Sequence, residues 1–396
     1  MAANGTGPLA GIRVLDLGRY QAGPRCGLIL ARMGAEVIKV ERPQGDESRE
    51  NGPMVRGQSA YWVQYNAGKK SITVNFRSER GKQVVKDLVK VSDILIQNFR
   101  PGVIDAMGLG YEVLRSLNPR IIMVNISAYG QFGPYRDRIG FDPIGQALSG
   151  HMAMTGFEGM PPIKTHFPVV DRITALHAAI GALAALHERE VSGMGQCLDV
   201  CLADSGYSMM EIDITAYKGV GHLGRRQGNR LGAPPNNTYQ CADGWVYITA
   251  GAQDMWPNVA RTIGRPEWAE DPRFGSRQKR AEHADVVDGA INAFLADKTV
   301  EQAVELFNRS DVPCAPVRDV PGAANDPHPW ERRLLVEVPD PVAGSIHVSG
   351  DYWHFSRSQV QVGSPPTVGQ HTEEVLREVL GYTPEQVAAL RAEKAV

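Results

Sequence analysis

The chain has 396 residues, which is more than one average domain and suggests two or three. Its 43% hydrophobic and 22% charged residues are typical of a globular protein, and a formal net charge of −2 gives no support to a nucleic-acid or membrane-surface role. No apolar run is long enough to cross a bilayer and the first residues lack the pattern of a signal peptide, so we expect a cytoplasmic protein.

The first half of the chain alternates between two kinds of pattern. Short β-branched and apolar runs predict strands, and helical patterns separate them; the runs lie at 13–17, 36–40, 94–96 and 121–124. This alternation predicts βαβ units and a parallel sheet.

Two helices are predicted from apolar composition and their end signals. The segment 26–33 predicts a helix that stops at Gly34. The Ala- and Leu-rich segment 175–190 predicts the clearest helix in the chain, with its C-cap near Gly193. A further strand is expected at 198–202.

The composition changes near residue 228. The segment 232–237 reads as a loop, and Asp243-Gly244 between two strand-like runs predicts a hairpin. Helices are expected at 300–307, 373–380 and 384–395. We therefore predict residues 1–227 as a large domain, 228–325 as a small α/β domain, and 326–396 as a segment that returns to the large domain.

The turn after the first strand does not carry a dinucleotide fingerprint. Residues 18–24 read GRYQAGP, which lacks GxGxxG, and Pro24 removes an N–H that could cradle a phosphate. No P-loop and no GxSxG elbow are present, although a Ser/His/Asp triad assembled from distant residues stays open. Five cysteines without a CxxC pair, and with no zinc-type spacing, predict neither a metal site nor a disulfide framework.

Basic residues follow several of the predicted strands, where ligands of open α/β sheets gather. They are Arg42, Lys69, Lys70, Arg77 and Arg100, and Phe99 stands beside Arg100. They either hold separate phosphates of an extended anionic ligand or are solvated surface charges; composition alone favours the second reading.

A set of motifs, in order along the chain, closely resembles class III CoA-transferases, the family that contains formyl-CoA:oxalate and carnitine CoA-transferases and also the α-methylacyl-CoA racemases. The motifs are GIRVLD at 11–16, QAGP at 21–24, GAEVIKVERP at 34–43, NAGKKSI at 66–72, NFRPG at 98–102, LNPR at 117–120, GFD at 140–142, QALSG at 146–150, GMGQ at 193–196 and GQHTEEVL at 369–376.

The resemblance implies a fold, an assembly and a nucleophile. The fold is α/β, with a large Rossmann-like parallel-sheet domain and a smaller α/β domain, and two subunits are expected to form an interlocked dimer. The family nucleophile matches Asp171, just before the long predicted helix. The pattern alone would make Asp171 an N-cap residue. A heteromer with a homologous subunit stays open.

The implied chemistry needs no tightly bound cofactor, because coenzyme A and acyl-CoA are substrates and a free carboxylic acid is the acceptor. An aspartate is ordinarily ionised at neutral pH, so its attack on a thioester is expected to need no general base. Asp171 and Gln21 are the catalytic residues by resemblance, and the Ala22 N–H lies near the site. Positions expected to contact CoA are Tyr20, Gln21, Ala22, Arg42, Val74, Arg77, Asn98, Phe99 and Arg100.

Two departures from the family pattern stand out. A basic residue often found after Pro-Gly is here Ala106, so Arg100 is expected to take over its phosphate contact. The glycine-rich lid of formyl-CoA transferase has no counterpart at 231–238, which argues against the oxalate enzyme.

Two other activities remain as alternatives. Racemases place a histidine in Gly-His-Asp, where this chain has Gly140-Phe141-Asp142, and phenylalanine exchanges no proton. A non-catalytic subunit of a heteromeric transferase is the second alternative. For the acyl group, Arg225, Arg226 and Arg230 either recognise a second carboxylate, as in a succinyl donor, or are surface charges.

Overall fold

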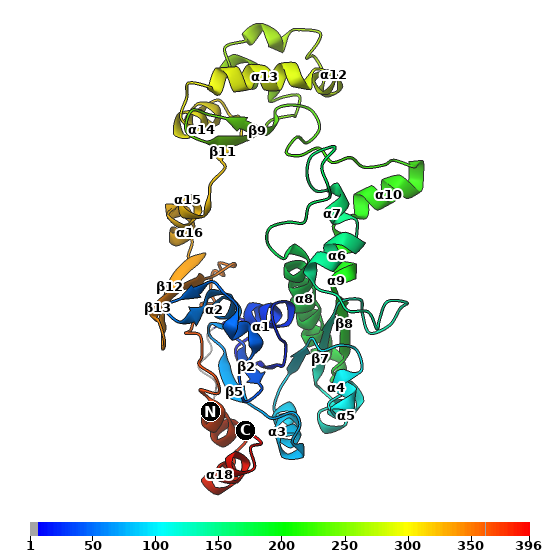
Figure 1. Ribbon diagram of the computed structural model, residues 1–396, viewed down its shortest axis with the longest axis vertical. Coiled ribbons are helices and arrows are strands. Elements are labelled where there is room, and N and C mark those ends of the chain that lie inside the picture. Colours follow the sequence, from blue (N-terminus) through cyan, green and yellow to red (C-terminus); the bar gives the residue numbers. More distant parts are fainter. Residues whose placement is uncertain (1–6, 361) are drawn as a thin grey trace. The chain divides into compact units, whose positions relative to one another are not determined.

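The computed structural model describes residues 7–360 and 362–396, and within them the chain divides into two compact units. The larger unit contains the described residues up to 152 together with 164–222 and 328–396. The smaller unit contains 153–163 and 223–327, so a short segment near residue 158 belongs with the second half of the chain. Figure 1 follows this path by colour.

A parallel sheet of six strands, counted over the described residues, forms the centre of the larger unit. All neighbouring strands pair in parallel, in the order β5-β2-β1-β6-β7-β8. Renumbered along the sheet this is 3-2-1-4-5-6, the order of doubly wound dinucleotide-binding folds. The predicted Rossmann-like sheet is confirmed. Its strands are β1 Arg13–Asp16, β2 Glu36–Glu41, β5 Lys70–Thr73, β6 Ile94–Gln97, β7 Ile122–Ser127 and β8 Cys197–Cys201.

Helices cover both faces of this sheet because successive strand residues point to opposite sides. Val14 packs with α1 Ala22–Ala31 and α8 Val169–Ser192 on one face. Leu15 packs on the other face with α3 Glu79–Lys90, α5 Tyr111–Leu117 and the C-terminal helix α18 Pro384–Ala392. The end of the chain thus completes the core begun by its first strand (Figure 1).

The remaining elements of the larger unit are short. They are η1 Glu47–Glu50, β3 Met54–Val55, β4 Gln58–Ser59, α2 Ala60–Asn66, α4 Val103–Ala106, α6 Asp142–Leu148, α9 Leu202–Ser208, α10 Glu211–Val220, β12 Leu335–Asp340, β13 Gly344–Ser349, α17 Thr372–Glu374 and η3 Val375–Val379. The helix predicted at 373–380 is therefore one short α turn followed by a π-helical turn.

The smaller unit is built on the predicted hairpin. β9 Asn236–Gln240 and β10 Trp245–Thr249 pair antiparallel around the Asp243-Gly244 turn, and β11 Cys314–Pro316 joins the other edge of β10. The sheet packs with a core that includes Trp256, Phe274 and Phe307. Its helices are α11 Trp256–Thr262, η2 Pro266–Ala269, α12 Arg277–Glu282, α13 Ala284–Leu295, α14 Val300–Arg309 and α15 Val320–Ala324; α7 His151–Met154 and α16 Pro327–Glu331 lie at the chain crossings.

Helix α8 is longer than its sequence pattern predicted. It starts at Val169, six residues before the predicted start at 175, and ends at Ser192 with Gly193 at φ 75°, as predicted. By length and composition α8 could cross a membrane, which differs from the expectation that no apolar run is long enough, although the core helix of a globular protein can have the same length and composition. One of its faces packs on α1 and the sheet, as a core helix does.

Candidate functional site

A cavity of ≈ 470 Å³ opens at the carboxyl ends of the parallel strands of the larger unit. It lies at the point where the strand order reverses, between β1 and β6, and there open α/β sheets bind their ligands. The loops that follow β1, β6 and β7 form most of its wall. They contribute Arg19–Ala22, Asn98–Pro101 with Val103, and Ile126–Ala128, and the other lining residues are Arg136, Arg138–Phe141, Asp171 and Leu202.

The structure brings most of the predicted site residues to this one cavity. Its walls include the predicted nucleophile together with both predicted loop triplets: Asp171, Tyr20, Gln21, Ala22, Asn98, Phe99 and Arg100. They come from segments separated by about 70 residues each, which only the parallel sheet places side by side.

Three predicted CoA contacts lie outside the cavity wall. Arg42 is exposed at the end of β2, where its Nε donates to the Gly45 carbonyl and its Nη1 lies 3.1 Å from Glu47 Oε1. Arg77 is exposed beyond the end of β5. The Val74 side chain is fully buried in the core, so only its backbone is available to a ligand.

Asp171 is the third residue of α8 and not its N-cap, so the helix-cap interpretation of the sequence pattern is wrong. The N-cap residue is Pro168, which has no side-chain acceptor. The capping carboxylate comes instead from Asp142, at the start of α6: its Oδ1 accepts from the Val170 N–H at 2.7 Å and from the Asp171 N–H at 3.1 Å. Its Oδ2 accepts from Gln146 Nε2 at 2.6 Å. The backbone of the predicted nucleophile is thereby held by a different helix.

The half-buried Asp171 carboxyl has a pKa of about 7, well above its ordinary value. Burial is the main cause, because it disfavours the charged form, and the negative charge of Asp142 adds to it. This corrects the expectation that the carboxylate is fully ionised at neutral pH. A more basic carboxylate is also a stronger nucleophile once ionised.

Gln21 stands next to the start of α8. Its side chain is 2% exposed, and Nε2 lies 3.4 Å from the Pro168 carbonyl oxygen. Within the described part of the chain, Oε1 is buried without a hydrogen-bond partner. The preceding residue, Tyr20, has φ 60°, a left-handed conformation that is unusual for a tyrosine. A buried unsatisfied amide next to a strained residue is typical of a site built for a ligand.

Asn98 supports the same loop from the end of β6. Its Oδ1 accepts from the Arg19 N–H at 2.7 Å and its Nδ2 donates to the Arg19 carbonyl at 2.8 Å. Phe99 packs edge-on against Phe76, with ring centroids 6.4 Å apart. Asn98 therefore holds the shape of the cavity wall as well as lining it.

The sequence pattern missed two arginines on the cavity rim. Arg136 and Arg138 lie in the irregular segment after β7, and the Arg136 guanidinium approaches the backbone at Gly102. With Arg100 they make the rim basic, which suits a ligand with several phosphates, whereas Arg19 in the same wall is paired with Glu47. The sequence feature that could have indicated them is the basic stretch PYRDR at 134–138. Exposed charges in a loop have no periodicity, however, so the pattern did not distinguish them from other surface charges.

A second hollow of ≈ 480 Å³ lies near the start of β5. Its polar residues already have partners: Asp340 accepts from Gln58 Nε2 at 3.0 Å, His371 Nδ1 accepts from the Ser71 N–H, and Lys70 pairs with Glu36 and Glu374. We therefore place the chemistry at the cavity that contains Asp171. Among the described residues no group of three or more His, Cys, Asp or Glu side chains could hold a metal ion.

The fold and the cavity are those of an α/β enzyme with a carboxylate at the switch point of a doubly wound sheet. The sequence model of CoA-transferase family III matches residues 9–372. The chain is 39% identical, over 98% of both chains, to succinyl-CoA–D-citramalate CoA-transferase of Chloroflexus aurantiacus. It is 35% identical, again over 98% of both, to the beta subunit of succinyl-CoA–L-malate CoA-transferase of the same organism.

A solved structure agrees with these relatives. The CaiB/BaiF family protein of Brucella suis superposes with a TM-score of 0.85 at 30% identity, over 94% of this chain and 99% of that one. The protein belongs to CoA-transferase family III and is a CoA-transferase of that family.

Proposed function

We propose that the enzyme moves CoA from an acyl-CoA thioester, with succinyl-CoA as the leading candidate donor, to a free carboxylic acid, through covalent intermediates on Asp171. The observation that carries the proposal is the shared cavity: the Asp171 carboxyl stands among the Tyr20–Ala22 and Asn98–Arg100 loops and below a basic rim. This arrangement supports thioester exchange, because the carboxylate can attack the thioester and the basic side chains can bind the phosphates of CoA.

The reaction follows from a carboxylate acting twice. An Asp171 oxygen attacks the thioester carbon, the C–S bond breaks, and a mixed anhydride and CoA thiolate form. The thiolate then attacks the Asp171 acyl carbon, and the first acid leaves as a carboxylate with the bridging oxygen. The acceptor carboxylate attacks the resulting aspartyl-CoA thioester, whose C–S bond breaks to give a second mixed anhydride and CoA thiolate. The thiolate then attacks the acceptor's own acyl carbon, and Asp171 leaves as the free carboxylate.

Each attack creates an oxyanion that needs hydrogen-bond donors. Gln21 Nε2 is one candidate, because its present acceptor, the Pro168 carbonyl, is held only at 3.4 Å. The Ala22 N–H is another, because Ala22 is the first residue of α1, where backbone N–H groups have no intrahelical acceptor. Both residues line the cavity.

The racemase alternative is weakened by the position of Phe141. Its side chain is 64% exposed and lines the same cavity as Asp171, at the position where the racemases carry their histidine. A phenyl ring offers no proton to exchange, so the second acid/base group of a racemase is missing there.

The names of the two relatives support a dicarboxylic donor; of the three arginines considered for its second carboxylate, Arg225 is exposed and the other two have partners. Arg230 is already paired within the smaller unit: its Nη2 lies 2.7 Å from Asp288 and 2.9 Å from Asp285. Arg226 donates to the Met160 carbonyl. We propose that groups other than Arg226 and Arg230 select the acyl donor. We also propose that CoA and the carboxylic acid are diffusing substrates, that the enzyme has no tightly bound cofactor, and that it is cytoplasmic.

Mass spectrometry of the protein after incubation with succinyl-CoA tests the nucleophile. We expect CoA held covalently on the peptide that contains Asp171, and no adduct in Asp171→Ala. Asp254→Asn, an exposed aspartate of the smaller unit, is the matched control and should form the adduct normally. An adduct that persists in Asp171→Ala would refute the mechanism.

The same incubation in D₂O separates the alternatives. Deuterium entering the α-carbon without exchange of labelled CoA would favour the racemase. A protein that gives neither signal alone, but exchanges CoA when a homologous subunit is added, would favour the non-catalytic subunit.

A further inference from the structure

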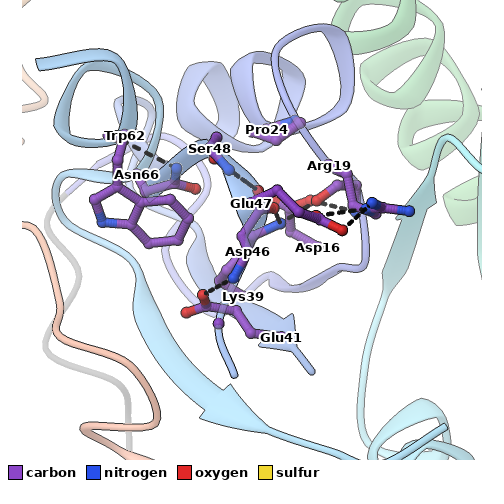
Figure 2. Close-up of polar contacts among 12 residues, drawn as sticks. Asp16, Arg19, Pro24, Lys39, Glu41, Asp46, Glu47, Ser48, Trp62 and Asn66 are labelled. Carbon is purple, nitrogen blue, oxygen red and sulfur yellow. Dashed lines mark hydrogen bonds and ion pairs between the residues drawn. The ribbon is translucent and has the colours of Figure 1, made fainter. Parts of the chain in front are cut away.

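Two fully buried lysines lie directly beneath the loop that carries Tyr20 and Gln21, and the proposed chemistry uses neither. Lys69 Nζ donates to Asp16 Oδ2 at 2.6 Å, to the Pro24 carbonyl at 2.7 Å and to Asn66 Oδ1 at 3.0 Å. Lys39 Nζ donates to the Gly18 carbonyl and lies 3.2 Å from Asp46 Oδ2. Figure 2 shows Asp16, Lys39 and Asp46 together in this buried region, with Pro24 at the start of α1.

The contacts fall on the two ends of the Gly18–Pro24 loop, which consists of the turn after β1 and the first three residues of α1. At its start, the Gly18 N–H donates to Asp16 Oδ1 at 2.9 Å, while the Gly18 carbonyl accepts from Lys39. At its end, the Pro24 carbonyl accepts from Lys69. Asp16 joins the two ends, because one oxygen binds Gly18 and the other binds Lys69.

The loop itself is closed tightly over this network. A Cβ added at Gly18 would lie 2.9 Å from the Gly23 Cα, and one added at Gly23 would lie 3.0 Å from the Gly18 Cα. A Cβ at Gly27 would meet Asp16 Oδ2 at 3.0 Å and Lys69 Nζ at 3.3 Å. Glycine at these positions therefore lets the turn and α1 rest directly on the ion pair.

Stability alone does not explain these buried ion pairs. Burying charges requires desolvation, and a buried pair is often no more stable than an apolar pair of similar size. Burial lowers the pKa of Lys69 to about 8 although Asp16 opposes it. At Lys39 burial acts in the same direction, but Asp16, Asp46 and Glu41 outweigh it and raise the pKa. Charged groups kept buried at such a cost point to a role in fixing geometry.

We infer that Lys69 and Lys39 are positioning residues, which clamp both ends of the Gly18–Pro24 loop and thereby hold the left-handed Tyr20 and the Gln21 amide against the start of α8. The inference rests on the proposed function, in that the loop is positioned for the chemistry of Asp171. In doubly wound folds a glycine-rich turn binds phosphate through its backbone. Here ion pairs fix the turn from below, and its side chains face the cavity.

The test compares a single variant with a charge-neutral pair. Lys69→Met leaves Asp16 buried without its ion partner and is expected to destabilise the fold strongly. Asp16→Asn/Lys69→Met removes both charges but keeps Oδ1 as an acceptor for the Gly18 N–H; the Pro24 carbonyl still loses its donor. Lys70→Met is the matched control, because the adjacent Lys70 pairs with Glu36 and Glu374 on other elements.

We expect kcat for CoA transfer, per folded molecule, to fall by about 100-fold in both Lys69 variants, as small misplacements at a reacting centre do. Lys70→Met should stay within ~2-fold. Amide hydrogen exchange over residues 18–23 should accelerate by roughly tenfold or more in the Lys69 variants only. A second neutral pair, Lys39→Met/Asp46→Asn, should show the same two effects if the Lys69 variants do not fold.

A structural role alone predicts a different result: the neutral pair would regain wild-type kcat once its stability returned. That recovery, or unchanged exchange over 18–23, would overturn the inference. If the wild-type protein forms no CoA adduct, the proposed function fails, and hydrogen exchange still decides whether the clamp exists.

Discussion

At the scale of single residues, burial and the neighbouring charge of Asp142 act on the pKa of Asp171 in the same direction. Burial raises the pKa of its carboxyl, and the carboxylate of Asp142 raises it further, to about 7. Asp142 also contacts the backbone of Asp171, because its Oδ1 accepts from the Asp171 N–H. The Asp171 backbone is therefore held in place by the same residue that makes its carboxylate more basic.

The first prediction concerns the pH dependence of the first chemical step. Because the attacking form is the carboxylate, the rate of adduct formation should be level above pH ~7.5 and fall about tenfold per unit well below pH 7. Single-turnover formation of the CoA adduct between pH 5 and 8.5 measures this. A level profile down to pH 5 would mean that Asp171 has an ordinary pKa.

The second prediction concerns stability. Since the folded-state pKa of Asp171 lies above its unfolded value, the unfolded chain ionises first, and the native protein loses stability as pH rises from about 4 to 7. Asp171→Asn removes this loss, so it should stabilise the protein by roughly 1–2 kcal/mol at pH 8 and hardly at all at pH 4. Thermal unfolding at the two pH values checks the difference, and an equal gain at both would contradict it.

At the scale of elements, a side chain at the start of α6 caps the start of α8. Asp142 at the start of α6 accepts from two N–H groups of the first turn of α8, and Gln146 in turn donates to Asp142 and accepts from the Thr165 N–H. The aspartate of the GFD motif thus supports the start of the helix that carries Asp171, whatever residue occupies the middle position of the motif.

The third prediction distinguishes the two roles of Asp142, as a hydrogen-bond acceptor that caps α8 and as a negative charge near Asp171. Asp142→Asn keeps an oxygen for the two N–H groups but removes the charge, so the acid limb of the pH profile should move to lower pH by about half a unit to one unit. Asp142→Ala also removes the cap and should lower the free energy of unfolding by ~1–2 kcal/mol. Adduct-formation rates and denaturant unfolding of both variants test this; an unmoved acid limb in Asp142→Asn would show that burial alone raises the pKa.

At the scale of the whole molecule, the larger unit leaves apolar side chains exposed on two helices. On α8, Ile180 is 62% and Val191 84% exposed, and on α10, Ile212 is 79% and Val220 84% exposed. Large apolar side chains exposed to this degree often lie at protein contacts. The expected dimer stays a prediction, and these faces are where we expect another subunit to pack.

The fourth prediction is therefore an assembly of twice the 43.2 kDa chain mass. Light scattering after size-exclusion chromatography should give this mass for the wild type and a smaller one for Ile180→Asp/Ile212→Asp. Glu301→Gln, an exposed substitution in the smaller unit, is the control and should leave the mass unchanged. A wild-type monomer that dimerises only with a homologous subunit would instead support the heteromer suggested by the beta-subunit relative.

The sequence by itself predicted most strands of the parallel sheet, its longest helix and the hairpin of the smaller unit, but not short helices such as α6, α9 and α10. β-Branched runs predicted the strands of the sheet because burial on both faces needs such residues, and the ordered motifs indicated the family and pointed to Asp171. Local pattern could not show that α8 starts at Val169, because the acceptor for its first N–H groups is Asp142, 28 residues away from Val170.

Only the tertiary structure decided the electrostatics of the site. The pKa of Asp171 depends on burial and on a carboxylate from another helix, and the rim arginines Arg136 and Arg138 reach the cavity from a loop without periodicity. The Gly18–Pro24 loop binds a lysine 45 residues beyond its end. Charge interactions act through space and not along the chain, so no reading of neighbouring residues could have placed them.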